Sequence, residues 1–308
     1  MSWRKMGRIF APSGDLPWAA HSALQPTPLL LDAENRIRLY LGMRDEAGVS
    51  RVGWIEVDAD DPSRVLDVAT TPALDVGAPG CFDDNGVVPC AVVPRDDGIY
   101  LYYAGYLLPR RVRFHVFGGL AVSRDGGRRF ERVRHTPVVD RTEDELLFRV
   151  IHSVRWNGQA WQAWYGGGSA FEAPDADGHT RAVYNIRYME SPDGIHFPDR
   201  GEVSIDVAAD EHRVGRPFVL HDPSRGYEMW FAGATRAENY RLRYARSEDG
   251  RRWRMATDDL GLACSPDGWD SEMMSYPAVV RRGGRSYLFY NGNGYGRTGV
   301  GWALREDG

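Results

Sequence analysis

The sequence predicts an all-β fold: a five-bladed β-propeller built from four-stranded antiparallel blades. Three observations support this prediction. One strand pattern recurs five times at a spacing of roughly 60 to 65 residues, turn residues separate the strands within each repeat, and no segment has a long helical periodicity. The five repeats fill the whole chain, so we expect a single domain over residues 1–308.

Each repeat contains an aromatic-rich strand that ends in glycine. A run of apolar and β-branched residues and a tight turn come before it, and strand, turn and strand together predict a β-hairpin. The five aromatic strands are residues 37–42, 99–105, 160–167, 227–233 and 286–292.

A third strand follows the hairpin and ends in a Ser-x-Asp-Gly turn in three of the repeats, at residues 123–130, 191–197 and 247–253. Asp-Gly favours a tight turn, and the aromatic residue after it starts a fourth strand. The fifth repeat reaches its Asp-Gly at residues 307–308 without a fourth strand. We therefore expect the strand-like segment 3–10 to supply that strand and close the ring.

The charge of the chain argues against nucleic acid and membrane partners. Its formal net charge is -5, and an acidic protein lacks the basic surface that phosphate backbones and anionic lipids attract. Lys5 is the only lysine, which leaves no residue for a Schiff base or a Gly-Lys phosphate loop. Three cysteines without a C-x-x-C pair, no signal-peptide pattern and no apolar run of membrane-spanning length predict a cytoplasmic protein.

In a four-stranded meander, the segments before the first strand and after the second strand lie on one face. The loops predicted for that face are long and rich in charged and aromatic residues, whereas the opposite face has short turns. The first strands run next to the axis, so polar residues at their entrances should point into one funnel. These entrances are residues 21–26, 82–89, 144–153, 210–217 and 269–277.

Four of the five entrances carry acids, and the candidate catalytic residues are Asp84, Glu145, Glu211 and Asp270. Clustered carboxylates suit glycosidic chemistry, because one protonates the leaving oxygen while another acts as base or nucleophile. Arginines keep acids ionised and bind anionic groups. The candidate substrate-binding residues are His21, Gln25, Arg44, Asp83, Arg149, His152, Arg216, Glu272, Tyr276 and Asn291.

Several of these residues have a second interpretation. An acid at a strand end is often a solvated residue or a cap, and His152 fits a buried core histidine as well as a ligand of substrate or metal. Arg110, Arg111 and Arg113 either bind a phosphate or carboxylate group or belong to a solvated loop. We expect no cofactor, and no ligand spacing specifies a metal, although oxygen ligands near the axis would suit calcium.

The repeats resemble the arabinanase, levansucrase and invertase superfamily of five-bladed propeller glycosidases, and are closest to an intracellular, glycosidase-like branch. The resemblance extends over essentially the whole chain and is carried by FDDNGVVP (82–89), the Ser-x-Asp-Gly turns, WDSEMMSYP (269–277) and YNGNGYGRTGVG (290–301). Well-studied members use an Asp from blade one, an Asp from blade two and a Glu from blade three. The resemblance implies Asp84 or Asp83 as transition-state stabiliser and Glu145 as general acid.

Blade one departs from the family pattern, because its entrance HSALQP (21–26) has no carboxylate. Either Glu211, Asp270 or Glu272 takes the missing role, or the reaction is not ordinary hydrolysis. The prediction is therefore a carbohydrate-active enzyme that cleaves or transfers a glycosidic bond of a small sugar or glycoside, with a phosphorylase or transferase variant open. The alternatives are a catalytically inert propeller that binds a glycan or a protein, and a biosynthetic enzyme that rearranges a sugar-derived metabolite without hydrolysis.

Overall fold

Twenty β-strands form the part of the chain that this computed structural model describes, residues 3–173 and 180–306. Consecutive strands pair as antiparallel meanders. The first meander consists of β2 (His21–Leu31), β3 (Arg36–Arg44), β4 (Ser50–Asp58) and β5 (Val65–Val68). The second consists of β6 (Val87–Arg95), β7 (Gly98–Leu107), β8 (His115–Ser123) and β9 (Glu131–Arg132). The third consists of β10 (Phe148–Trp156), β11 (Trp161–Phe171), β12 (Ala182–Ser191) and β13 (Glu202–Ile205), and the fourth of β14 (Glu211–Asp222), β15 (Gly226–Thr235), β16 (Arg241–Ser247) and β17 (Arg254–Met255).

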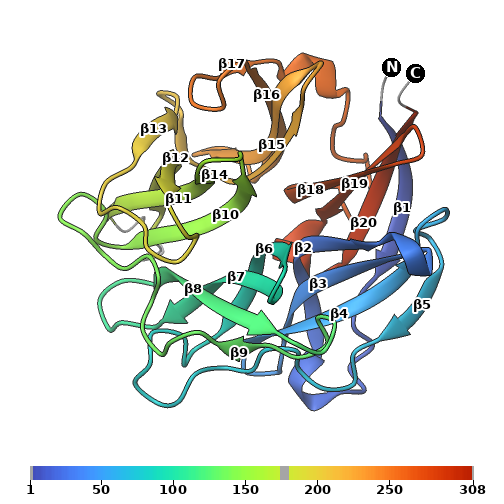
Figure 1. Cartoon of the computed structure of the whole chain (residues 1–308), viewed down its shortest axis with the longest axis horizontal. Helices are drawn as coiled ribbons and strands as arrows, with labels where there is room; N and C mark the ends of the chain where they lie inside the picture. The colour runs from blue at the N-terminus through green and yellow to red at the C-terminus, as the bar shows by residue number, and fades with distance from the viewer. Residues whose placement is uncertain (1–2, 174–179, 307–308) are drawn as a thin grey trace.

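The last group of strands combines segments from both ends of the chain. It contains β18 (Ser275–Arg282), β19 (Arg285–Asn291), β20 (Val300–Glu306) and, paired antiparallel with β20, the N-terminal strand β1 (Arg4–Phe10). Figure 1 shows blue β1 beside red β20. The strand-like segment before the first repeat is therefore the fourth strand of the last group.

The five groups lie around a common centre, and β2, β6, β10, β14 and β18 are nearest to it (Figure 1). Apolar clusters fill the space between neighbouring groups, because each sheet buries both faces. One of these clusters joins the first and last groups through Leu39, Phe289 and Trp302. Short parallel contacts between β8 and β10 and between β12 and β14 add hydrogen bonds between groups. The innermost strands are thus held in fixed positions around the centre.

The Ser-x-Asp-Gly turns connect neighbouring groups. Within the first turn, the Asp125 carboxylate accepts hydrogen bonds from the next backbone N–H groups, which fixes its shape. A carbonyl of each turn then accepts a hydrogen bond from an aromatic residue of the preceding group: Gly127 from Tyr40, Gly194 from Tyr102 and Gly250 from Trp164, each at 2.7 Å. The repeated turn and the repeated aromatic strand therefore form one connection between adjacent sheets.

Helical structure is limited to single turns. The described residues contain α1 (Asn293–Gly296) and 3-10 turns at Pro17–Ala19, Asp32–Glu34 and Thr257–Leu260. No helix in residues 3–173 and 180–306 is long and apolar enough to cross a membrane. The prediction of an all-β fold is confirmed.

Candidate functional site

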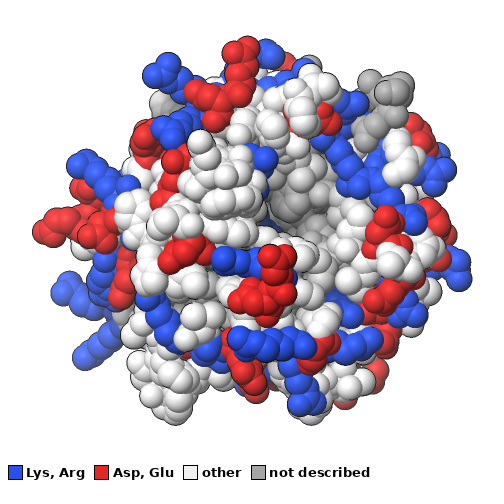
Figure 2. Space-filling view, viewed as in Figure 1, with Lys and Arg blue, Asp and Glu red and all other residues white. Residues whose placement is uncertain are grey.

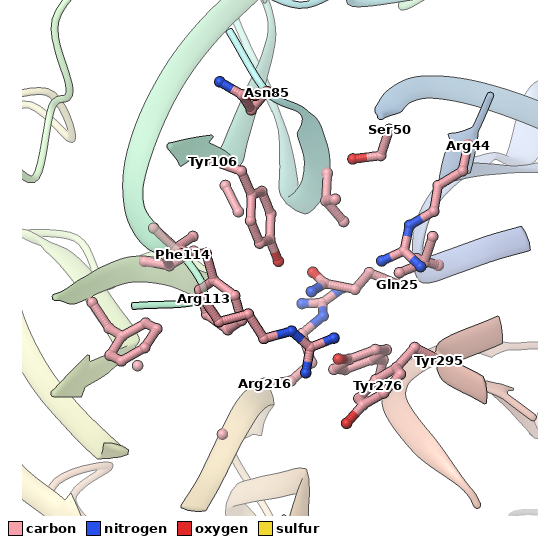
Figure 3. A pocket seen from close by; sticks show the side chains of 18 of the residues that line it. Gln25, Arg44, Ser50, Asn85, Tyr106, Arg113, Phe114, Arg216, Tyr276 and Tyr295 are labelled. Carbon is pink, nitrogen blue, oxygen red and sulfur yellow. The ribbon is translucent and has the colours of Figure 1, made fainter. Parts of the chain in front are cut away.

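A cavity of about 290 Å³ lies where the innermost strands meet. Figure 3 shows residues that line this cavity, and Figure 2 shows a hollow at the centre of the face turned toward the viewer. Each of the five loops predicted to share a face contributes lining residues, among them Gly48, Tyr106, Tyr184, Tyr240 and Tyr295. The cavity is therefore assembled from all five groups of strands.

Irregularities in the inner strands turn polar side chains toward this cavity. The pairing of every inner strand with its neighbour shifts register at the depth of the cavity. The skipped residues include Gln25, His152, Arg216 and Tyr276, all of which line the cavity. A β-bulge of this kind bends the strand and re-aims the bulged side chain.

Three of these residues also have an unusual backbone conformation. The φ angles of Gln25, Arg216 and Tyr276 are 52°, 56° and 57°, and a proline follows each of them. Left-handed conformations cost free energy in residues with a side chain, and they cluster at functional sites where the surrounding structure holds them. Asn291 provides such support, because its side chain accepts a hydrogen bond from the Gln25 backbone N–H at 2.7 Å and donates one to the Ala23 carbonyl.

Four arginines line the cavity: Arg44 from the end of β3, Arg113 from the loop before β8, and Arg213 and Arg216 from β14. Figure 3 shows Arg44 and Arg113 reaching from different loops toward Gln25 and Arg216. Arg213 donates a hydrogen bond to the Tyr295 hydroxyl at 3.0 Å and lies over the ring of Tyr240. No Asp or Glu of residues 3–173 and 180–306 belongs to the lining.

His152 is the histidine in the described lining of the cavity. Burial and the neighbouring positive charge of Arg216 hold the pKa of His152 well below its usual value, so the imidazole is neutral. Its Nδ1 has no hydrogen-bond partner among the described residues. A neutral imidazole has one ring nitrogen that donates a hydrogen bond and one that accepts a hydrogen bond or a proton.

Ten substrate-binding residues were predicted, and the structure divides them into two sets. Gln25, Arg44, His152, Arg216 and Tyr276 line the cavity. The other five, His21, Asp83, Arg149, Glu272 and Asn291, do not belong to its lining. Within this second set, Arg149 is 2% exposed and forms an ion pair with Glu145 at 2.6 Å, and Asn291 supports Gln25 from behind.

The prediction that the acids of the strand entrances surround the cavity is wrong. None of Asp84, Glu145, Glu211 and Asp270 lines it. Asp84 instead accepts hydrogen bonds from the Gly80 backbone and the Asn85 side chain, and the other three are 1 to 8% exposed. Burial raises the pKa of Glu145 in spite of Arg149 and Arg187, as a general acid would require, but this carboxyl is sealed from the cavity.

A repeated structural unit explains these buried acids. Asp83, Glu145 and Asp270 each accept a hydrogen bond from the tyrosine that follows 20 residues later, namely Tyr103, Tyr165 and Tyr290, at 2.9 Å. Each also pairs with a cation: Arg132, Arg149 and Lys5, respectively. The acids recur because they tie the entrance of the inner strand to the second strand.

The glycine at the end of the aromatic strand belongs to the same unit. A side chain at Gly105 would collide with Asp83, and one at Gly167 would collide with Glu145. In the fourth group, where Phe231 replaces the tyrosine, Glu211 instead pairs with Arg243 at 2.9 Å. The first group has no acid at this position, and its Tyr40 bonds to a turn carbonyl instead.

Sequence reasoning placed Arg213 near the funnel and left Arg113 open between an anion-binding residue and a solvated loop, and both line the cavity, but it did not select a set of aromatic residues that line it as well. The aromatics are Tyr106, Phe114, Tyr184, Tyr240 and Tyr295, and the polar residues Ser50 and Asn85 complete the set. The feature of the sequence that could have identified these aromatic residues is their position in the long segments predicted to lie on the same face as the strand entrances. The same lining gives no support to an axial calcium ion, because four guanidinium groups and no described carboxylate face that space.

Comparison with known proteins gives one full-length relationship and a consistent fold. No family model matches the chain. It is 37% identical to the uncharacterized protein Rv1502 of Mycobacterium tuberculosis (strain H37Rv) over 308 residues, which cover 100% of both chains. The uncharacterized protein MT1551 of strain CDC 1551 matches to the same extent.

Several of the solved structures similar to this chain are described as glycoside hydrolases. A structure from the GH130 family of mannoside phosphorylases and glycoside hydrolases has a TM-score of 0.72 at 14% identity, covering 99% of this chain and 93% of the other. A glycosyl hydrolase from Bacteroides ovatus has a TM-score of 0.71 at 15% identity with the same coverage. A thermostable family-43 glycoside hydrolase has a TM-score of 0.67 at 17% identity, covering 92% and 88%. The chain thus has the fold of the propeller-type glycoside hydrolases, and by its full-length identity it belongs to the family of the mycobacterial proteins Rv1502 and MT1551.

Proposed function

We propose that this protein is a carbohydrate-active enzyme whose working site is the axial cavity, and that its five groups of strands are the blades of one propeller closed by β1. The observation that carries the proposal is the convergence of Gln25, His152, Arg216 and Tyr276 from four inner strands on one cavity. Polar groups that bond hydroxyls, set among tyrosine faces that stack on a ring, suit a sugar. The fold shared with glycoside hydrolases supports the same substrate class.

The chemistry of this site differs from the usual pair of carboxylates. Hydrolysis by two acids needs carboxyl groups that reach the glycosidic bond from both sides, and the described lining of this cavity contains none. His152 lines the cavity with a neutral imidazole that can accept a proton, and its Nδ1 has no hydrogen-bond partner in the described part of the chain. We therefore assign proton transfer to His152 and a structural role to the buried acids.

A second candidate function is binding of a sugar-derived ligand without turnover. The lack of a carboxylate in the described lining favours it, because recognition requires only the arginines, the tyrosines and Gln25. The two functions differ in one measurement. A binding protein retains its ligand unchanged, whereas an enzyme converts it.

The test compares His152→Gln with Asp84→Asn and Glu145→Gln. Each purified variant would be assayed for turnover of a panel of glycosides, sugar phosphates and uronic acid derivatives, and for folding by circular dichroism. We expect His152→Gln to lower turnover by at least a hundredfold, the lower end of what a general acid or base contributes. Asp84→Asn should retain wild-type turnover.

Two outcomes would contradict the proposal. The first is loss of turnover in a well-folded Asp84→Asn protein while His152→Gln keeps wild-type turnover. This result would indicate that the strand-entrance acids, and not His152, are catalytic. Absence of turnover across the panel, combined with tight binding of one of its sugars, would favour the binding function. Glu145→Gln is informative only together with its unfolding curve, because this substitution also removes a buried ion pair.

A further inference from the structure

Among the described residues, the lining of the cavity carries positive charge without a matching carboxylate. Arg44, Arg113, Arg213 and Arg216 all line it, and none of the four forms an ion pair with a carboxylate of residues 3–173 and 180–306. Other arginines of this chain pair closely with acids, as Arg38 does with Glu56 at 2.6 Å and Arg132 with Asp83 at 2.8 Å. The four guanidinium groups of the cavity therefore have no carboxylate partner in the described part of the chain that an anionic ligand would have to displace.

Arg216 is the strongest case. Its side chain is buried, with 2% exposed, and burial lowers its pKa to about 10, so it remains charged at neutral pH. It donates hydrogen bonds to the Cys90 carbonyl at 2.6 Å, the His152 carbonyl at 3.1 Å and the Thr27 hydroxyl at 3.0 Å. These partners are neutral, and its Nε has none among the described residues. A buried cation without a counter-ion is costly for the fold, so an anion in the cavity would stabilise it.

The remaining lining suits a sugar ring of limited size. Tyr106, Tyr276 and Tyr295 point toward the same space as the arginines (Figure 3). A volume of about 290 Å³ is at the lower end of the range for small-molecule sites, roughly 300 to 1,000 Å³. One sugar unit with a charged substituent fits this volume better than an oligosaccharide.

We infer that the axial cavity recognises an anionic monosaccharide, a sugar phosphate or a sugar carboxylate, through Arg44, Arg113, Arg213 and Arg216. Guanidinium groups bind both phosphate and carboxylate oxygens, often through two parallel hydrogen bonds. The inference rests on the proposed function, because it places the sugar in the same cavity. It adds that the ligand is anionic, a property that the similarity of fold does not indicate.

The experiment is isothermal titration calorimetry of the full chain with glucose 1-phosphate, glucuronate, glucose and inorganic phosphate. We expect one or both anionic sugars to bind at least tenfold more tightly than glucose and inorganic phosphate. Binding of glucose 1-phosphate alone would assign a phosphate ester, and binding of glucuronate alone a carboxylate. Arg44→Met and Arg213→Met should each weaken this binding at least tenfold.

Arg282→Met is the matched control. Arg282 lies outside the cavity lining and pairs with Asp32 and Asp60, so its loss should leave Kd unchanged. Two cavity variants are used because one of them could unfold, and the thermal unfolding curve of each would be recorded first.

Three results would overturn the inference. The first is binding of glucose as tightly as the anionic sugars, with the same affinities in wild type and both cavity variants. This result would show that the arginines do not recognise an anion, but the cavity would still bind a sugar, so the proposed function would survive. The second is inorganic phosphate binding as tightly as glucose 1-phosphate, which shows that the sugar ring contributes nothing. The third is absence of binding by any of the four compounds in a protein that also has no turnover on the glycoside panel, in which case both proposals fail.

Discussion

Asp270→Asn separates a structural role of the strand-entrance acids from a catalytic one. The Asp270 carboxylate is 1% exposed and accepts hydrogen bonds from Lys5 at 2.7 Å and Tyr290 at 2.9 Å. Hydrogen bonds to a charged group contribute about 1.5 to 3 kcal/mol each, against about 0.5 to 1.5 kcal/mol between neutral groups. Asparagine keeps an acceptor oxygen but loses the charge, so the free energy of unfolding should fall by about 2 kcal/mol. The unfolding midpoint should fall by roughly 3 °C.

Urea unfolding at pH 7 measures the free energy of unfolding. Isothermal titration calorimetry with the sugar that binds wild type measures the affinity of the cavity for that sugar. We expect lower stability and unchanged affinity, because Asp270 does not line the cavity. Asp32→Asn is the control, since Asp32 is an exposed partner of Arg282, and its loss should change stability by less than about 1 kcal/mol. The reasoning is refuted if Asp270→Asn unfolds like wild type while turnover falls a hundredfold or more.

Three further predictions follow from the same contacts. Trp3→Ala should destabilise the protein by about 3 to 5 kcal/mol in urea unfolding, because this side chain is 5% exposed and packs edge-on against Trp230; a change below about 1 kcal/mol would contradict the role of the N-terminal segment. Tyr40→Phe should lower the free energy of unfolding by about 1 kcal/mol, because it removes the 2.7 Å hydrogen bond to the Gly127 carbonyl. An unchanged urea midpoint would show that this hydrogen bond between sheets does not stabilise the protein. Because the folded-state pKa of His152 is lowered, the unfolded chain takes up a proton first as the pH falls below about 6.5. Stability should then drop by up to about 1.4 kcal/mol per pH unit from this group, and His152→Gln should show a shallower decline between pH 6.5 and 5 in urea titrations.

The all-β fold could be predicted because its signals are local. Asp-Gly turns, alternating apolar residues and aromatic strands ending in glycine each depend on a few neighbouring residues. The recurrence of these signals placed the strands close to where they lie, with β3, β7, β11, β15 and β19 over the five aromatic segments. The pairing of β1 with β20 depended on one further consideration, that an unpaired edge strand needs a partner.

Five of the fourteen predicted site residues line the cavity, and the direction of each side chain decides which ones do. Gln25, His152, Arg216 and Tyr276 belong to the inner strands, which topology alone brings to the axis. The acids precede the same strands, and their repetition suggested chemistry. Their regular spacing from a tyrosine instead marks a unit that each sheet needs for its own packing.

The sequence by itself determined the strands, the turns between them and the face on which the long loops lie, because these depend on local conformational preference and hydrophobic pattern. Only the tertiary structure decided which polar groups meet in the cavity. A strand shifted by one residue turns its side chains to the opposite face, and the register shifts beside Gln25, Arg216 and Tyr276 are defined by how each inner strand pairs with its neighbour. The tertiary structure also decided the charge of the cavity, because its arginines come from strands and loops far apart in the chain. Glu145 and Asp270 lie outside the lining, where they pair with Arg149 and Lys5.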